Sequence, residues 1–129
     1  MSHFSRIKTS ITNVEVLQKT LQDLKFECSI GKSQLKDSNG NLEYVDIVAK
    51  KNNKNIIGFL WNRTEYIFIS DFGLWQDYQN MYPENIIEKI LQQYAINSII
   101  RSSNTEGFKT IEKQKLTNGS IKLVLQRWS

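Results

Sequence analysis

Apolar and polar residues follow one another between Tyr44 and Ile69 in a pattern that predicts the centre of an antiparallel sheet. In the segment 44–50, YVDIVAK, apolar residues alternate with polar ones, which is typical of a strand with one buried face. The segment 56–61, IIGFLW, is apolar on both faces, so we expect it either to be covered on both sides or to lie in mid-sheet under helices. The segment 66–69, YIFI, is β-branched and aromatic throughout and predicts a neighbouring strand.

Two further features of this region bear on how the strands pair. The connections 51–55 and 62–64 are short and rich in Asn, a residue that tolerates left-handed backbone angles. We therefore expect each strand to pair antiparallel with the next one along the chain. Gly58 interrupts the central apolar run and marks either a bulge or a close backbone approach.

Two segments carry apolar residues at helical spacing. The first predicts a helix over residues 13–24, where Thr12 and Glu15 have the spacing of a capping box. The second predicts a helix over residues 84–103, with Pro83 at its first turn, where proline is favoured. The predicted apolar stripes are Val14, Leu17, Leu21 and Leu24 in the first helix and Ile86, Ile87, Ile90, Leu91, Tyr94 and Ala95 in the second.

Additional strands are predicted before the sheet centre. Residues 4–11 alternate and predict a first strand, and Phe26, Cys28 and Ile30 alternate in a second. We expect Cys28 to be buried as a small hydrophobic residue. The polar segment 31–41 contains the turn signal SNGN and predicts a loop or a weak hairpin.

The C-terminal segments 108–116 and 121–128 predict two strands joined by a hairpin turn at 117–120, TNGS. Together these elements predict an α+β fold, a mainly antiparallel sheet with two helices packed on it, in a single domain over residues 1–129. The residues predicted to form the core are Leu17, Leu21, Ile47, Phe59, Ile67, Ile69, Ile90, Leu91 and Leu123.

The composition limits the chemistry that this chain can perform. Cys28 and His3 are the only residues of their kinds, which excludes a disulfide framework, a multi-cysteine zinc site and a histidine-rich metal site. Residues 31–33, GKS, resemble the end of a phosphate-binding loop, but the first glycine that this loop requires is absent. We therefore assign no catalytic, cofactor-binding or metal-binding residue. No apolar run is long enough to span a bilayer, and the N-terminus lacks the apolar core of a signal peptide.

The net charge of +4 suggests a nucleic-acid partner, but the type of basic residue weakens this interpretation. Only four of the 17 basic residues are Arg, while Lys, Asn and Ile abound, as in proteins encoded by A+T-rich genomes. A codon bias of that kind raises the Lys content without any selection for a binding surface.

The segment 71–78, DFGLWQDY, holds more aromatic surface than a loop needs. One interpretation is a lid, in which Phe72 and Trp75 fold back over the core. The other is a recognition patch, in which Trp75 anchors a partner. The other residues of that patch, which would orient the partner, are Asp71, Gln76 and Asp77.

Five motifs together resemble a family of small plastid-encoded proteins, the hypothetical chloroplast open reading frame numbered thirty-five, which has cyanobacterial relatives and is classed as a domain of unknown function. They are the opening MSHFSRIKTSI, the central GFLWNR, the loop DFGLWQD, the helix motif ILQQYA and the closing NGSIKLVLQRW. The resemblance covers nearly the whole chain. It implies a location in the chloroplast stroma of an alga and implies no activity, so no site residue is transferred from it.

Three classes of function remain after these exclusions. The first is a non-catalytic accessory or adaptor protein that binds another plastid protein through a sheet edge or the Trp75 loop. The alternative is a nucleic-acid-binding domain with a basic and aromatic face, formed if the terminal strands pair. The third is an enzyme in which acidic residues hold a hard cation. The residues concerned are Arg6, Lys8, Lys122, Arg127 and Trp128 for nucleic acid and Asp46, Asp71 and Asp77 for the cation.

Overall fold

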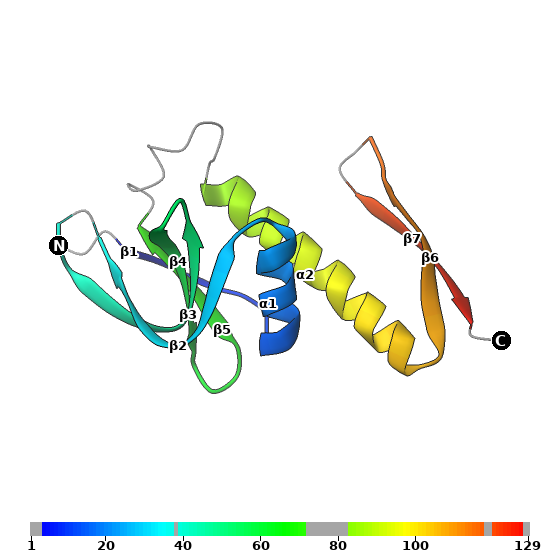
Figure 1. Cartoon of the computed structure of the whole chain (residues 1–129), viewed down its shortest axis with the longest axis horizontal. Helices are drawn as coiled ribbons and strands as arrows, with labels where there is room; N and C mark the ends of the chain where they lie inside the picture. The colour runs from blue at the N-terminus through cyan, green and yellow to red at the C-terminus, as the bar shows by residue number, and fades with distance from the viewer. Residues whose placement is uncertain (1–3, 38, 72–82, 118–119, 128–129) are drawn as a thin grey trace. The chain divides into compact units, whose positions relative to one another are not determined.

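The computed structural model describes residues 4–37, 39–71, 83–117 and 120–127. Its elements are β1 (Phe4–Lys8), α1 (Val14–Asp23), β2 (Glu27–Lys36), β3 (Leu42–Lys51), β4 (Lys54–Trp61), β5 (Tyr66–Asp71), α2 (Pro83–Thr105), β6 (Phe108–Lys115) and β7 (Ile121–Arg127). The α+β class is confirmed (Figure 1). The chain forms two compact units, residues 1–94 and 95–129, so the single domain over the whole chain stays a prediction.

The first unit contains a five-stranded sheet in the order β1-β5-β4-β3-β2, with every neighbouring pair antiparallel. The strand that is apolar on both faces, β4, is the middle strand, as predicted. The turn between β3 and β4 holds Asn52 and Asn53 at φ angles of 52° and 64°. Asn accepts this left-handed geometry more readily than most residues, which explains the tight connection.

One face of this sheet is covered by α1 and by the first part of α2, as predicted. Leu17 and Leu21 of α1 and Ile90 of α2 are fully buried there. The sheet contributes apolar side chains from its three central strands, among them Ile47, Ile57, Phe59 and Phe68. The rings of Phe59 and Phe68 meet edge to face with centroids 5.8 Å apart.

The opposite face is covered by the sheet itself, because the hairpin formed by β2 and β3 extends beyond the other strands (Figure 1). We call its far part, 33–36 and 42–45, the β2–β3 arm. Leu35 and Val45 of this arm belong to a second buried cluster, together with Val48 and Ile69.

Gly58 makes this covering possible. A Cβ atom on residue 58 would lie only 2.5 Å from Val45 Cγ1 and 2.7 Å from Leu35 Cδ1. Of the two roles that the sequence left open for Gly58, the structure shows the close approach. Glu43 of the arm reaches further and forms an ion pair with Arg6 on β1, the opposite edge strand of the sheet.

The ends of α1 differ from the prediction. The N-cap is Asn13, whose Oδ1 accepts a hydrogen bond from Val16 N at 3.0 Å, so the predicted capping box at Thr12 is wrong. Asn13 takes this role because its side-chain oxygen reaches the third helical N–H. At the other end Lys25 adopts a φ of 69°, and Phe26 N donates to Leu21 O at 2.9 Å. The helix thus ends in a Schellman-type turn that uses lysine in place of the usual glycine.

Several predicted positions in the first unit need correction. Segment 31–41 is mostly strand, because 33–36 of β2 pair with 42–45 of β3, and only a tight turn around Asp37 is left. Cys28 is half-buried rather than buried, since β2 is an edge strand.

Three residues of the predicted core are less buried than expected. Leu91 of α2 is 37 % exposed, while its neighbour Ile90 is fully buried, so the apolar face of the helix is narrower than predicted. Ile67 is partly buried against the second cluster, and Leu123 on β7 is half-buried. The other predicted core residues, Leu17, Leu21, Ile47, Phe59, Ile69 and Ile90, are confirmed.

The second unit consists of the last part of α2 and the hairpin of β6 and β7, which pair antiparallel as predicted. The pairing has a register shift between Thr110 and Glu112. Ile96 and Ser103 are the buried residues of this unit's part of α2.

Candidate functional site

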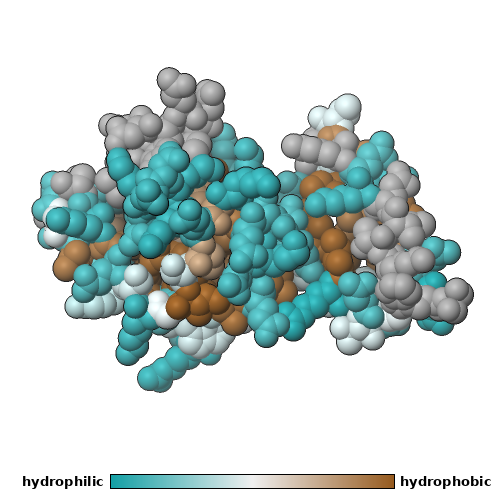
Figure 2. Space-filling view, in the orientation of Figure 1, coloured by the Kyte–Doolittle hydropathy of each residue, from teal (hydrophilic) through white to brown (hydrophobic). Residues whose placement is uncertain are grey.

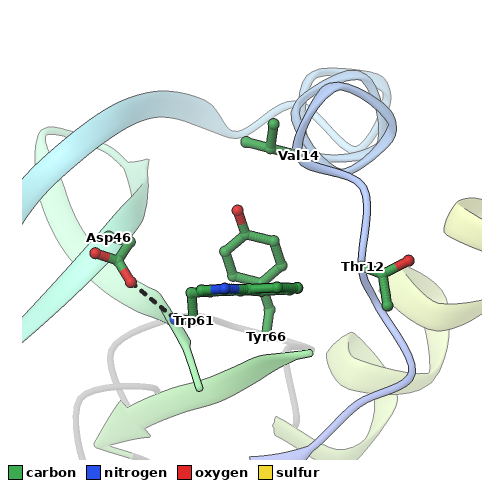
Figure 3. Close-up of a pocket in the computed structure, with 5 residues that line it drawn as sticks. All are labelled: Thr12, Val14, Asp46, Trp61 and Tyr66. Carbon is green, nitrogen blue, oxygen red and sulfur yellow. Dashed lines mark hydrogen bonds between the residues drawn. The ribbon is translucent and has the colours of Figure 1, made fainter. Parts of the chain in front are cut away.

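A hollow of about 430 Å³ lies in the first unit, next to the start of α1 (Figure 3). We call it the aromatic–carboxylate pocket. Trp61 and Tyr66 come from β4 and β5, and Asp46 comes from β3. The remaining lining residues are Thr12, just before α1, and Val14, its first residue. The pocket thus combines two aromatic rings, one carboxylate, a hydroxyl and an aliphatic side chain.

The two aromatic rings are positioned by strand pairing. Trp61 and Tyr66 lie directly opposite each other where β4 passes into β5, and their ring centroids are 4.9 Å apart with planes tilted by 56°. The turn between them is held by Asn62, whose Oδ1 accepts hydrogen bonds from Thr64 N and Glu65 N at 3.0 Å and 2.8 Å. The local sequence therefore fixes the angle at which the rings meet.

Asp46 is placed by the end of the β3–β4 ladder. The last paired residues are Ile47 and Phe59, and beyond them Trp61 N donates to Asp46 Oδ2 at 2.8 Å in place of a strand carbonyl. The side chain is half-buried and accepts no other hydrogen bond from the residues that the structure describes. One carboxylate oxygen therefore stays available to a ligand.

The backbone of Tyr66 is held by hydrogen bonds, and its ring lines the pocket. Tyr66 N donates to Ile11 O at 2.9 Å, and Thr9 Oγ1 donates to Tyr66 O at 2.6 Å. Burial, the negative charge of Asp46 and the neighbouring Tyr94 raise the pKa of the Tyr66 hydroxyl. The hydroxyl is consequently neutral at physiological pH, and no described residue forms a hydrogen bond with it.

Three backbone N–H groups around the start of α1 have hydrogen-bond partners within the protein. The Tyr94 hydroxyl of α2 accepts hydrogen bonds from Thr12 N at 3.1 Å and from Asn13 N at 3.0 Å. Val16 N is taken by the Asn13 cap. The N–H groups that often bind an anion at a helix N-terminus therefore already have protein partners at these positions.

Of the site residues predicted from the sequence, the structure describes Asp71, which does not line the pocket. Asp71 is at the end of β5, opposite Phe4 of β1, and its side chain is 2 % exposed. Trp75, Gln76 and Asp77 fall outside the described residues, so the recognition patch and the alternative lid are both untested.

The described residues also bear on the two other hypotheses from the sequence, the nucleic-acid face and the cation site. The terminal strands do not pair, because β1 belongs to the five-stranded sheet and β7 to the separate β6–β7 sheet. The pairing condition for the basic nucleic-acid face is therefore not met. Of the three acidic residues considered for a cation, Asp46 lines the pocket and Asp77 is not described. The described residues contain no cluster of three or more metal-ligating side chains.

The pocket was not predicted from the sequence, although Asp46 was considered as a ligand for a cation. The available signal was the position of two aromatic residues at both ends of the short connection 62–65, one strand away from Asp46. That they share a face follows only from the register of the three strands.

Comparison with known proteins shows which family the chain belongs to. Residues 20–124 match the family described as protein of unknown function (DUF1257). The chain belongs to this family. It is 38 % identical over 128 residues to uncharacterized protein ycf35 of Guillardia theta, covering 99 % of this chain and 98 % of the relative. The protein of the same name from Pyropia yezoensis is 36 % identical over 129 residues, with 100 % and 99 % covered. No solved structure matches the chain.

The relatives agree with the resemblance found from the motifs. A third protein named ycf35, from Cyanophora paradoxa, is 35 % identical and covers 99 % of this chain and 98 % of its own length. These family members are plastid-encoded proteins of algae, which implies a plastid location for this chain. Neither helix, over its described residues, has the length and hydropathy that a membrane crossing requires.

Proposed function

We propose that this chain is a non-catalytic accessory or adaptor protein of the chloroplast stroma that binds another plastid protein. The observation that carries the proposal is the outer surface of the β2–β3 arm, where Leu42 is 53 % exposed and Tyr44 is 67 % exposed. Figure 2 shows a small patch of apolar surface beside hydrophilic surface where this arm lies. Large apolar side chains exposed next to each other are typical of protein interfaces.

The arrangement of the arm explains why these two residues are free for a partner. Glu43 and Val45, which alternate with them, turn inward to Arg6 and to Gly58. Leu42 and Tyr44 therefore point outward from the same strand, because successive side chains alternate between faces. A tyrosine with a polar rim is a common anchor at protein interfaces. Gln34 and Lys36, the strand partners of Tyr44 and Leu42, supply such a rim.

The segment around Trp75 is a second proposed contact for the same partner. Trp75 would anchor, and Gln76 and Asp77 would orient the partner. Asp71, at the end of β5, would fix the base of the segment.

Nucleic acid is the alternative partner, and the described basic residues favour it less. Arg6 is paired with Glu43 and Lys19 with Asp23, so part of the positive charge is balanced locally. Lys8 of β1 and Lys122 and Arg127 of β7 belong to different sheets. Sequence-independent binding requires a continuous basic surface, which separate sheets do not build by pairing.

The test is affinity capture from algal plastid extract, with and without nuclease, followed by identification of the captured proteins. We expect the wild type to retain a defined protein in both conditions and the double variant Leu42→Ser/Tyr44→Ser to lose it at unchanged thermal stability. The matched control is Ile30→Ser, which removes an exposed apolar side chain of β2 outside the arm. Trp75→Ala tests the second contact in the same way. Capture that disappears with nuclease favours the nucleic-acid alternative, and equal capture by all variants refutes the proposed surface.

A further inference from the structure

The charge of the aromatic–carboxylate pocket is set by one residue. Asp46 is the one ionised group among the described side chains that line it, although the protein as a whole carries a net charge of +4. Its single described hydrogen bond, from Trp61 N to Oδ2, fixes the orientation of the carboxylate without neutralising it. A half-buried carboxylate held in this way attracts a positively charged group and can accept hydrogen bonds from it.

The walls of the pocket favour the same class of ligand. Trp61 is 40 % exposed, so part of its surface is open to a ligand. The Tyr66 ring packs against it at a tilt of 56°, with the ring centroids 4.9 Å apart, so the two rings form one angled aromatic wall. Figure 3 shows the Tyr66 hydroxyl pointing away from its backbone, toward Val14. Aromatic faces attract ammonium and guanidinium groups, and two rings beside a carboxylate resemble the aromatic cages that bind such groups.

An anion is disfavoured at the same place. The N–H groups of Thr12, Asn13 and Val16, which would otherwise attract it, donate to Tyr94 and to the Asn13 cap. The Asp46 charge repels an anion directly. The neutral Tyr66 hydroxyl adds an acceptor for the N–H of a cation.

We propose that the aromatic–carboxylate pocket binds an organic cation, an ammonium or guanidinium group, against the Trp61 and Tyr66 rings and beside the Asp46 carboxylate. Such a group is carried by a free amine or by a basic side chain of a protein. The proposal stands apart from the adaptor function, because it rests on a different surface and is tested with the purified protein alone.

The experiment compares ligands of one shape and different charge. Butylammonium, butanol and butyrate are titrated into the ¹⁵N-labelled protein, and the backbone resonances of Asp46 and Tyr66 and the Trp61 indole N–H are followed. We expect saturable shifts at these three residues with butylammonium and none with butanol or butyrate. Ethylguanidinium should behave like butylammonium. An N-acetyl-lysine amide distinguishes the sources: tighter binding than butylammonium indicates a protein side chain, and equal binding indicates a free amine.

Variants separate recognition from folding. Asp46→Asn keeps an oxygen for the Trp61 N–H and removes the charge, so we expect it to fold and to bind butylammonium roughly tenfold more weakly or worse. Trp61→Leu should weaken binding more than Trp61→Phe, because only phenylalanine keeps an aromatic face. Matched controls are Glu27→Gln, the same loss of charge on an exposed part of β2, and Tyr44→Leu, the loss of an aromatic ring outside the pocket.

Each of the following results would overturn the proposal. Butanol that binds as well as butylammonium would show a hydrophobic hollow without charge recognition. Unchanged binding of butylammonium by a folded Asp46→Asn protein would show that the carboxylate does not recognise the ligand. If Asp46→Asn does not fold, the proposal is tested by the affinities of Trp61→Phe and Trp61→Leu for butylammonium. Equal affinities would show that the aromatic ring does not contribute to binding.

Discussion

At the scale of single residues, Gly58 determines how closely the β2–β3 arm packs on the sheet. It lies in the middle strand and allows Val45 and Leu35 of the β2–β3 arm to pack directly on the backbone of β4. An inserted methyl group would overlap both side chains. The contact therefore links one missing Cβ atom to the closure of a whole sheet face.

We expect Gly58→Ala to lower the free energy of unfolding by about 1–3 kcal/mol, the usual cost of overpacking. Urea unfolding measures this. Val45→Ala should destabilise by itself, but the double variant should lose less than the sum of the single variants, because alanine at 45 removes the atom that lies nearest. Additive losses would contradict the close contact.

Cys28 gives a pH-dependent test at the same scale. Burial raises the pKa of its thiol, so the folded protein holds this proton more tightly than the unfolded chain does. The resulting stabilisation is complete below the ordinary thiol pKa and is lost as the pH rises through the raised pKa. We expect the unfolding free energy of the wild type to fall more steeply in this alkaline range than that of Cys28→Ala. Parallel curves from urea unfolding at several pH values would refute the assignment.

At the scale of elements, the buried face of α2 is narrow. Ile90 is fully buried against the sheet, and the next residue, Leu91, is 37 % exposed. We expect Ile90→Ala to cost about 2–5 kcal/mol, as buried large-to-small changes do. Leu91→Ala should stay within about 1 kcal/mol and serves as the control of equal size. Thermal or urea unfolding of the two variants provides the comparison, and equal losses would argue for the wider apolar face that the sequence predicted.

The start of α1 offers a second test of an element. Asn13→Ala removes the oxygen that accepts the Val16 N–H, so we expect a loss of about 1 kcal/mol of stability. Thr12→Ala changes an exposed side chain and should cost less than about 0.5 kcal/mol. Denaturant midpoints of both variants against the wild type measure the difference. A larger loss for Thr12→Ala would restore the capping box predicted from the sequence.

At the scale of the whole molecule, the two compact units differ in how much core each contains. The buried clusters with their strands and helices lie within residues 1–94. Residues 95–129 contribute only the end of α2 and one hairpin, in which the described β7 side chains are at most half-buried. The segment 95–129 is shorter than the roughly 40 residues below which a domain usually needs disulfides, metals or oligomerisation in order to fold.

We therefore expect a peptide of residues 95–129 to lack a cooperative thermal transition by circular dichroism, while the full chain unfolds in one transition. The physical reason is that a short unit buries too little apolar surface to offset its conformational entropy. The full chain followed by both circular dichroism and Trp fluorescence is the control. A cooperative transition of the isolated peptide would contradict the single domain over residues 1–129.

The sequence by itself determined the three central strands, both helices and most of the core. Period-two alternation and the doubly apolar segment 56–61 predicted the three central strands and their antiparallel order, because neighbouring strands with short Asn-rich connections have few other ways to pair. Helical spacing placed both helices, and Leu17, Leu21 and Ile90 in them, on the sheet. These features depend on residues close together in the chain, which is why local patterns contain them.

Only the tertiary structure decided the features that depend on distant residues. The arm folds over the second sheet face because Gly58 leaves room for Val45. These two residues lie on different strands, and no local sequence pattern predicts that they are in contact. Asn13 replaces Thr12 as the cap because its side chain reaches the Val16 N–H, while Tyr94, far along the chain, takes the Thr12 N–H. The pocket likewise exists only because the register of three strands and the start of α1 bring Asp46, Trp61 and Tyr66 together. Register and long-range contacts are set by the packing of the whole core, so they cannot be read from any one segment.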